Sequence, residues 1–303
     1  MASLGWQVTR TLFGIGERVA PKLAGRAAFE LFARTPNPRI QTDGERKAIA
    51  RAADFMSTAR HHRLSAGKDC VAVHEFRPDS GSGEAGRALV VHGWRSRTEY
   101  MRALVEGLRA AGYRVFAVDL PGHGQSAGRR LTIMKGVDAL ANVAQWFGPF
   151  DVVLGHSFGG AVAVNAVAGS LAGTTLLCAR RLVLIAAPNS ISEILDGFGR
   201  QIGLGRRSRD AMAERIERIA KRRLDDFAGS RQLARVAIPT LVVHAPDDRE
   251  VPADDARTYA GAGPHVTLHW APGLGHRRIL ADTGVVARTV SFAKAATPLA
   301  KVV

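Results

Sequence analysis

The ten residues from Asp151 to Gly160 read DVVLGHSFGG and place Ser157 between two glycines, each two positions away. The apolar residues Val152 to Leu154 are typical of a buried strand, and the small apolar residues Ala161 to Ala168 predict a helix. A chain that passes from strand to helix within one residue forces that residue into a strained backbone conformation, for which flanking glycines leave room. We therefore predict that Ser157 is a nucleophile held at the edge of a sheet.

The composition is that of a folded chain with one large domain or two small ones. Of 303 residues, 46% are hydrophobic, and no apolar run reaches the length of a membrane span. Cys70 and Cys178 are too few, and too apolar in their setting, for a disulfide framework or a metal site, which favours a reducing, cytoplasmic compartment. The N-terminus lacks the charged segment of a secretory signal. Nothing in the pattern calls for a metal or a cofactor.

The formal charge of +15 raises the question of an anionic partner. Of the 42 basic residues only seven are lysine, and the arginines are scattered through nearly every segment instead of forming one block. A general bias toward arginine explains this distribution, and no recognisable nucleic-acid-binding motif accompanies it. We therefore do not expect nucleic acid to be a partner.

The first 60 residues are predicted to form an N-terminal helical extension. Residues 1 to about 36 interleave apolar side chains with arginines, as an amphipathic helix does, and the segment ends at Pro36 and Pro38. Gly14, Gly16 and Pro21 weaken the helix in its first half. Such a segment fits packing against its own domain or a weak peripheral contact with a membrane surface, and both interpretations stay open. A second helical stretch covers residues 42–59.

From residue 61 onward, short apolar strands alternate with amphipathic helices. Residues 61–66 and 70–76 predict a hairpin with a turn at 67–69. Further strands are predicted at 88–91, 113–118, 152–154, 181–187, 239–244 and 265–270, and helices at 98–111, 131–147, 253–262 and 279–295. This alternation indicates an α/β fold with a mostly parallel central sheet and helices on both faces. The core comprises residues 61–189 and 237–303, and the arginine-rich residues 190–236 form a small helical cap inserted between two strands.

A serine hydroxyl becomes a good nucleophile only when a histidine accepts its proton and a carboxylate orients that histidine. Asp247 and Asp248 follow the strand at 239–244, and His276 follows the last strand, so all should meet Ser157 at the carboxyl edge of the sheet. We prefer Asp248 as the acid and keep Asp247 as the alternative, because either could instead cap the next helix.

Three further polar residues lie in loops at the same edge. His92 and His123 are in glycine-containing loops, and we expect them to order those loops instead of acting as bases. Asp119 precedes the serine in the chain, so we assign it a loop-stabilising role.

These motifs resemble those of the α/β-hydrolase superfamily over about residues 61–296. The resemblance rests on His92-Gly-Trp94, DLPGHGQS from Asp119 to Ser126, GHSFG from Gly155 to Gly159, Asp247-Asp248 with Val251-Pro252, and Gly275-His276. It implies an α/β-hydrolase fold with a Ser157-Asp248-His276 triad. It also implies an oxyanion hole made by the backbone N–H groups of Trp94 and Phe158.

Dehalogenases and epoxide hydrolases of this superfamily need a carboxylate as the nucleophile at the position of Ser157. The serine found here therefore argues against both of these activities. The resemblance thus favours an esterase or lipase-like hydrolase that cleaves a carboxylic ester through an acyl-enzyme. The same triad would serve a thioesterase, a peptidase or a C–C bond hydrolase. Alternatives of other classes are a non-catalytic binding protein on this scaffold and a charge-driven binder of membranes or nucleic acid.

Arginines follow several of the strands whose ends should surround the site: Arg95, Arg97, Arg129, Arg130, Arg249, Arg277 and Arg278. A rim of guanidinium groups would attract a small acyl substrate that carries a carboxylate or phosphate. The chain is rich in arginine throughout, so several arginines are expected near any site, and these residues need have no function there. The sequence leaves the oligomeric state open.

Overall fold

The computed structural model describes residues 4–37, 41–66, 69–79 and 85–295. These residues form two compact units by their contacts. Met1–Arg34 and Ser190–Ala228 make up a helical unit, and Thr35–Asn189 and Gly229–Val303 make up a sheet unit.

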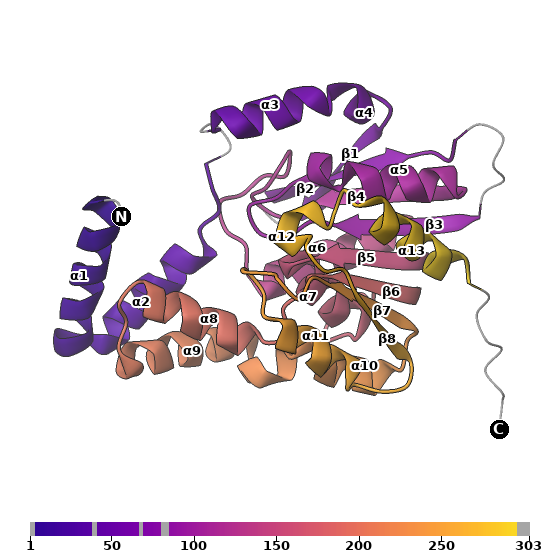
Figure 1. Cartoon of the computed structure of the whole chain (residues 1–303). Coiled ribbons are helices and arrows are strands. Elements are labelled where there is room, and N and C mark those ends of the chain that lie inside the picture. The colour runs from indigo at the N-terminus through magenta and orange to yellow at the C-terminus, as the bar shows by residue number, and fades with distance from the viewer. Residues whose placement is uncertain (1–3, 38–40, 67–68, 80–84, 296–303) are drawn as a thin grey trace. The chain divides into compact units, whose positions relative to one another are not determined.

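The sheet unit contains one eight-stranded sheet in the order β1-β2-β4-β3-β5-β6-β7-β8 (Figure 1). The strands are β1 (Arg60–Ala66), β2 (Asp69–Phe76), β3 (Gly86–Val91), β4 (Tyr113–Asp119), β5 (Phe150–His156), β6 (Ala179–Ile185), β7 (Thr240–His244) and β8 (Val266–Trp270). Strand β2 runs antiparallel to both β1 and β4, and all other neighbouring strands are parallel. The predicted mostly parallel sheet is confirmed, and the predicted turn at 67–69 falls largely outside the described residues.

The central strands are apolar throughout because both faces of the sheet are covered. Val152 and Leu154 of β5 point into a core cluster with Leu104 and Leu108, whereas Val153 between them is equally buried but faces the other side. The helices of the sheet unit are α5 (Arg102–Ala110), α6 (Ile133–Phe147), α7 (Phe158–Val167), α10 (Gly229–Val236), α11 (Ala253–Ala260), α12 (Gly275–Arg278) and α13 (Thr283–Lys294). The 3₁₀ turn η1 (Thr98–Met101) leads into α5. Parallel strands that end together place their carboxyl-terminal loops at one edge, which is where the candidate site lies.

Two short helices before β1 belong to the sheet unit. A capping box between Thr42 and Glu45 begins α3 (Asp43–Arg51), and α4 (Ala53–Ser57) follows. Phe55 of α4 stacks on Phe76 of β2 with ring centroids 4.6 Å apart. The buried side chains of α4 join the core cluster of the sheet. Of the predicted extension of residues 1–60, residues 1–34 therefore belong to the helical unit and residues 35–60 to the sheet unit.

The helical unit joins the start of the chain to the predicted cap region. It contains α1 (Leu4–Val19), α2 (Pro21–Ala33), α8 (Ile191–Gln201), α9 (Arg206–Ala220) and η2 (Leu224–Phe227). Pro21 takes the first position of α2, where its missing N–H costs nothing, and so separates α2 from α1. Helix α2 packs closely on α9, since a Cβ atom on Gly25 would come within 2.4 Å of the Ser208 carbonyl oxygen.

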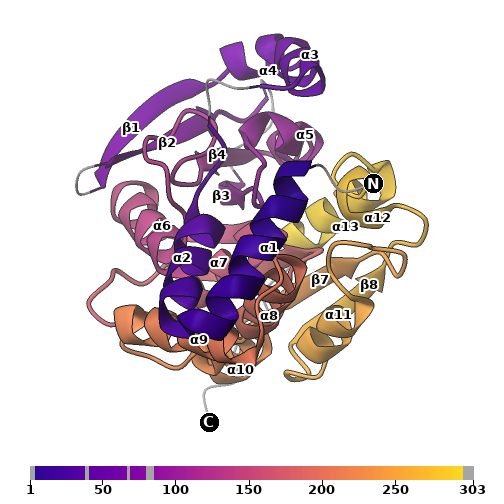
Figure 2. The same cartoon turned by 90° about the vertical axis from the view of Figure 1, so that its left-hand side faces the viewer.

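Polar contacts reinforce the helical unit. The Glu17 carboxylate of α1 accepts the backbone N–H groups of Arg207 (3.2 Å) and Ser208 (2.9 Å) at the start of α9. Glu30 of α2 forms an ion pair with Arg215 of α9 at 3.6 Å. Figure 2 shows α1 and α2 side by side with α9 beneath them. The N-terminal helices thus pack on the insertion, an association across about 190 residues that no local pattern indicates.

Candidate active site

Ser157 lies on a sharp turn between β5 and α7, as predicted from the motif around it. Its backbone has φ 52° and ψ −129°, a conformation that L-residues rarely adopt. A Cβ atom on Gly159 would lie 2.3 Å from the His92 carbonyl oxygen, and one on Gly155 would lie 2.5 Å from the Gly160 Cα. The glycines are therefore required by close backbone approach, which lets the turn hold Ser157 at the strand end.

The structure brings Ser157, His276 and Asp248 together from three separate parts of the chain. The Ser157 hydroxyl donates to His276 Nε2 with an Oγ to Nε2 distance of 3.0 Å. On the other side of the ring, His276 Nδ1–H donates to Asp248 Oδ2 at 2.7 Å. The His276 side chain is 7% exposed and the Asp248 carboxylate is fully buried. This is the arrangement in which a histidine can take a serine proton while a carboxylate orients the ring.

Asp248 and Asp247 differ clearly in their surroundings. Asp248 Oδ1 accepts the backbone N–H groups of Glu250 (2.7 Å) and Val251 (3.0 Å), which leaves Oδ2 for His276. Burial would raise the pKa of Asp248, but the hydrogen bonds from His276 and these two amides hold the pKa below its ordinary value. Asp247 is exposed and accepts the backbone N–H of Gly273 at 2.7 Å. Of the two carboxylates, only Asp248 contacts the histidine among the described hydrogen bonds.

His276 is the second residue of the short helix α12. Gly273 and Gly275 just before it have φ of 81° and 60°, so glycine is needed for the turn that leads into the helix. His156 Nε2–H donates to the His276 carbonyl oxygen at 3.0 Å and so fixes the backbone of α12. Burial lowers the pKa of His156 to about 3, which keeps its ring neutral beside His276. The motif around Ser157 does not predict this role for His156, although His156 immediately precedes the serine.

The two residues expected to form an oxyanion hole lie beside Ser157. Phe158 is the first residue of α7, and N–H groups in the first turn of a helix have no acceptor within that helix. The loop that carries Trp94 passes against the serine, since a Cβ atom on Gly93 would lie 2.8 Å from Ser157 Cβ. The rings of Trp94 and Phe158 meet edge to face at 5.7 Å. Both residues therefore lie near the nucleophile, and their role as oxyanion donors stays a prediction.

Histidines and a buried aspartate hold the loops around Trp94. His123 Nδ1–H donates to the Pro121 carbonyl oxygen at 3.1 Å, so its Nε2 is free to accept the Arg95 backbone N–H, also at 3.1 Å. Burial lowers the pKa of His123 to about 4. His92 Nε2 likewise accepts the Leu120 N–H at 3.0 Å.

Asp119 is fully buried at the end of β4 and binds the loops on both sides. Its carboxylate accepts the backbone N–H of Thr98 (3.0 Å), the Thr98 hydroxyl (2.9 Å) and the Gln125 N–H (2.8 Å). Burial opposes its charge, but the hydrogen bond from His74 Nε2–H at 3.0 Å and these donors hold its pKa well below the ordinary value. Among the described hydrogen bonds, Asp119 contacts none of Ser157, His276 and Asp248, and it stabilises loops, in keeping with the expectation for it.

The arginines near the site are partly neutralised by carboxylates. Arg97 pairs with Glu99 at 2.7 Å, and Arg277 pairs with Glu250 at 3.0 Å. Glu250 Oε2 is also 3.8 Å from His276 Nε2, the atom that accepts the Ser157 proton. The sequence does not predict this second carboxylate near the histidine, because nothing in the position of Glu250 relative to Asp248 indicates on which side of the histidine it will lie.

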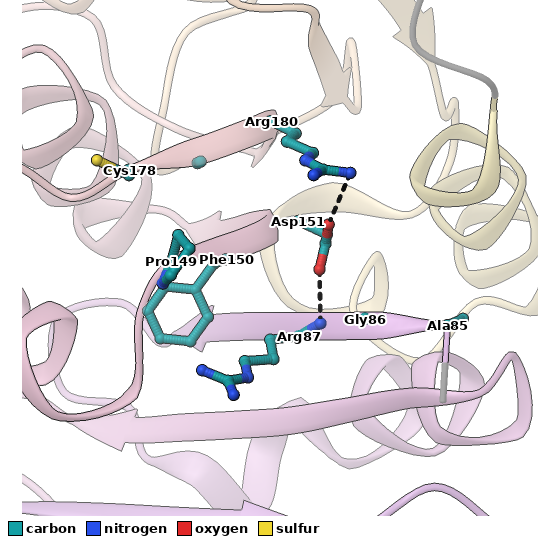
Figure 3. Close-up of a pocket in the computed structure, with 9 residues that line it drawn as sticks. Ala85, Gly86, Arg87, Pro149, Phe150, Asp151, Cys178 and Arg180 are labelled. Carbon is teal, nitrogen blue, oxygen red and sulfur yellow. Dashed lines mark hydrogen bonds and ion pairs between the residues drawn. The ribbon is translucent and has the colours of Figure 1, made fainter. Parts of the chain in front are cut away.

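A pocket with a volume of about 580 Å³ lies at the opposite edge of the sheet, where β3, β5 and β6 begin (Figure 3). Its charged groups satisfy one another: Asp151 accepts the Arg87 backbone N–H at 2.8 Å and pairs with Arg180 at 3.4 Å. Ser157, Asp248 and His276 are not among its lining residues. We therefore locate the candidate active site at the triad and not at this pocket.

Metal binding and membrane spanning find no support in the part of the chain that the structure describes. No cluster of three or more His, Cys, Asp or Glu side chains is arranged to bind a metal ion there. Among the same residues, every helix is too short or too polar to cross a bilayer.

Comparison with known proteins assigns the chain to a family. Residues 88–289 match the model of a family described as the alpha/beta hydrolase family. A pimeloyl-[acyl-carrier protein] methyl ester esterase from Xanthomonas campestris pv. campestris is 30% identical over 257 residues, which cover 70% of this chain and 97% of the relative.

Solved structures agree with this fold. An esterase from Rhodococcus sp. ECU1013 superimposes with a TM-score of 0.57 at 20% identity, covering 78% of this chain and 99% of that one. The ferulic-acid-bound esterase Est1E from Butyrivibrio proteoclasticus gives 0.60 at 18% identity, covering 77% and 96%. At these identities the two structures support the fold alone.

Proposed function

Because this chain belongs to the alpha/beta hydrolase family, we propose that it is a serine esterase that cleaves a carboxylic ester through an acyl-enzyme intermediate. The observation that carries the proposal is the hydrogen-bonded series from Ser157 through His276 to Asp248. The name of the Xanthomonas relative, a methyl ester esterase, supports an ester over a thioester or an amide.

In the first half of the proposed reaction, Ser157 Oγ attacks the ester carbonyl carbon while its proton passes to His276 Nε2, 3.0 Å away. The carbonyl oxygen becomes an oxyanion in a tetrahedral intermediate. When the intermediate collapses, the bond to the leaving oxygen breaks and His276 gives that oxygen the proton. The alcohol departs, and the acyl group stays on Ser157.

Asp248 supports this proton transfer without taking part in it. Its carboxylate holds His276 with Nδ1 protonated, so that Nε2 presents the lone pair that accepts the serine proton. It also stabilises the imidazolium that forms. The backbone N–H groups of Phe158 and Trp94 would stabilise the oxyanion, and such a donor typically contributes roughly 3 to 4 kcal/mol.

The second half repeats these steps with water in place of the serine. His276 takes a proton from the water, which attacks the acyl carbonyl carbon, and the new tetrahedral intermediate releases the carboxylic acid. The proton returns to Ser157 Oγ, and the enzyme is restored. No external oxidant, reductant or cofactor is needed to balance either half.

We also propose that residues 190–236 influence which acyl groups are accepted. The segment leaves the sheet unit after β6, the strand next to the one that carries Ser157, and its residues 190–228 form helices with α1 and α2. Insertions at such a point commonly control access to α/β active sites.

Hydrolysis of 4-nitrophenyl esters with acyl chains of increasing length tests the proposed function. We expect turnover that follows acyl length and that disappears in Ser157→Ala. Thioesters with matched acyl groups serve as the comparison, since cleavage of the thioesters without the esters would transfer the function to a thioesterase. A folded protein that cleaves neither would favour a non-catalytic role.

A further inference from the structure

Helix α1 exposes a continuous apolar stripe. Val8, Leu12, Ile15 and Val19 follow one another at steps of four, three and four residues, so they share one face of the helix. Their exposed fractions are 51%, 63%, 55% and 79%. Leu23, at the start of α2, extends the exposed set at 66%. These account for most of the large apolar side chains that the described structure leaves exposed.

The stripe is not needed to hold the helical unit together. The opposite face of α1 makes that contact, because Glu17 binds the start of α9 and Trp6 and Phe13 are partly buried. An apolar side chain that stays exposed to water gains no free energy from burial. A row of such side chains on one helix face therefore indicates a surface that is covered under other conditions.

The border of the stripe carries positive charge. Arg18, Lys22 and Arg26 are exposed near its C-terminal half. The acidic residues of α1 and α2, Glu17 and Glu30, are both directed to α9, where they bind the Ser208 N–H and Arg215. The charges around the stripe are therefore of one sign.

We propose that the stripe of Val8, Leu12, Ile15, Val19 and Leu23 docks on an anionic lipid bilayer, with α1 lying in the plane of the interface. Apolar side chains on one face and cations at its border match the acyl chains and headgroup phosphates of such a surface. Helix α1 cannot span a bilayer, which leaves binding in the interfacial plane. A second copy of this chain is a poorer match, because a symmetric contact would bring like charges together.

The surface also has a consequence for the proposed function. Binding through one short amphipathic helix would be reversible. It would bring an esterase to the lipid bilayer, where long-chain esters accumulate. Binding to vesicles can be measured without any substrate, so failure of the membrane proposal and failure of the esterase proposal are distinguishable.

The test uses the full chain in flotation with two kinds of vesicles, pure phosphatidylcholine and phosphatidylcholine with about a third phosphatidylglycerol. We expect binding to the anionic vesicles that weakens as salt is raised. In the double variant Leu12→Gln and Ile15→Gln we expect the partition coefficient to fall by about tenfold or more. The reason is that two side chains lose the favourable free energy of transfer from water into the bilayer. The triple variant Arg18→Gln, Lys22→Gln and Arg26→Gln should bind with little dependence on salt.

Trp146→Gln is the matched control, because Trp146 is a large apolar side chain, 69% exposed, on α6 of the sheet unit. Each variant should keep its thermal unfolding midpoint and its rate on a soluble short-chain ester, because these residues lie outside the triad. Absence of vesicle binding by the unaltered chain would overturn the proposal. So would equal loss of binding in Trp146→Gln, or a dimer in analytical ultracentrifugation that Leu12→Gln and Ile15→Gln dissolve.

Discussion

Replacing Asp248 by asparagine tests how the carboxylate controls His276. Oδ1 of Asp248 accepts two backbone N–H groups, those of Glu250 and Val251, at 2.7 and 3.0 Å. An asparagine at this position will keep its carbonyl oxygen toward these donors, because an NH₂ group there would face two N–H groups and leave them unpaired. Its NH₂ group then points at His276 Nδ1.

The consequence is a change of tautomer. Because the asparagine can only donate at this position, His276 Nδ1 must accept, and the ring proton moves to Nε2, which then cannot take the Ser157 proton. The known effect of this exchange in serine enzymes with a His-Asp pair is a loss of about 10⁴ in kcat. We expect a loss of that order for Asp248→Asn in steady-state hydrolysis of a 4-nitrophenyl ester, with little change in the unfolding midpoint.

Asp247→Asn is the matched control. Its side chain is exposed and accepts only the Gly273 N–H at 2.7 Å among the described hydrogen bonds, which an asparagine oxygen can also do. We expect kcat to change by less than about tenfold. If Asp247→Asn were the more damaging of the two, or if Asp248→Asn kept normal turnover, the two backbone donors would not control the tautomer of His276 through residue 248.

Two further predictions concern groups near the triad. The pKa of His123 is about 4 in the folded protein and near 6.5 in an unfolded chain. Between these two pH values, only the unfolded chain binds the proton. The free energy of unfolding should therefore fall by roughly 3 kcal/mol as the pH drops from about 6.5 to about 4. Urea unfolding from pH 7 to 4.5 should show a smaller fall in His123→Gln, and an identical slope would contradict this assignment. Glu250 lies 3.8 Å from His276 Nε2 and is about half exposed, so Glu250→Gln should raise kcat/KM for an anionic ester several-fold relative to a neutral ester of equal length. Equal changes on both esters would mean that Glu250 does not act through its charge.

The strands and the nucleophile turn could be predicted because their signals are local. A strand buried on both faces is apolar at every position, as in Val152 to Leu154, and the turn needs glycine where backbones approach closely. The meeting of Ser157, Asp248 and His276 could be predicted from the same logic. Each follows the end of a parallel strand, and those ends share one edge of the sheet.

Contacts between distant segments could not be predicted in this way. Glu17 binds the start of α9, but its sequence neighbours carry no indication of that partner. The burial of Phe55 against Phe76 likewise depends on a path that α3 and α4 take outside the repeating strand-helix pattern. For the same reason, the boundary predicted at residue 60 differs from the one at residues 34 and 35 in the structure.

Covalent labelling shows whether Ser157 is the nucleophile. The full chain is treated with a fluorophosphonate, which reacts with activated serines, and the adduct is located by mass spectrometry of proteolytic peptides. We expect one adduct, on Ser157, with its rate lowered strongly in His276→Ala and no labelling in Ser157→Ala. An adduct on another serine, or ester hydrolysis that persists in Ser157→Ala, would contradict the assignment of Ser157 as the nucleophile.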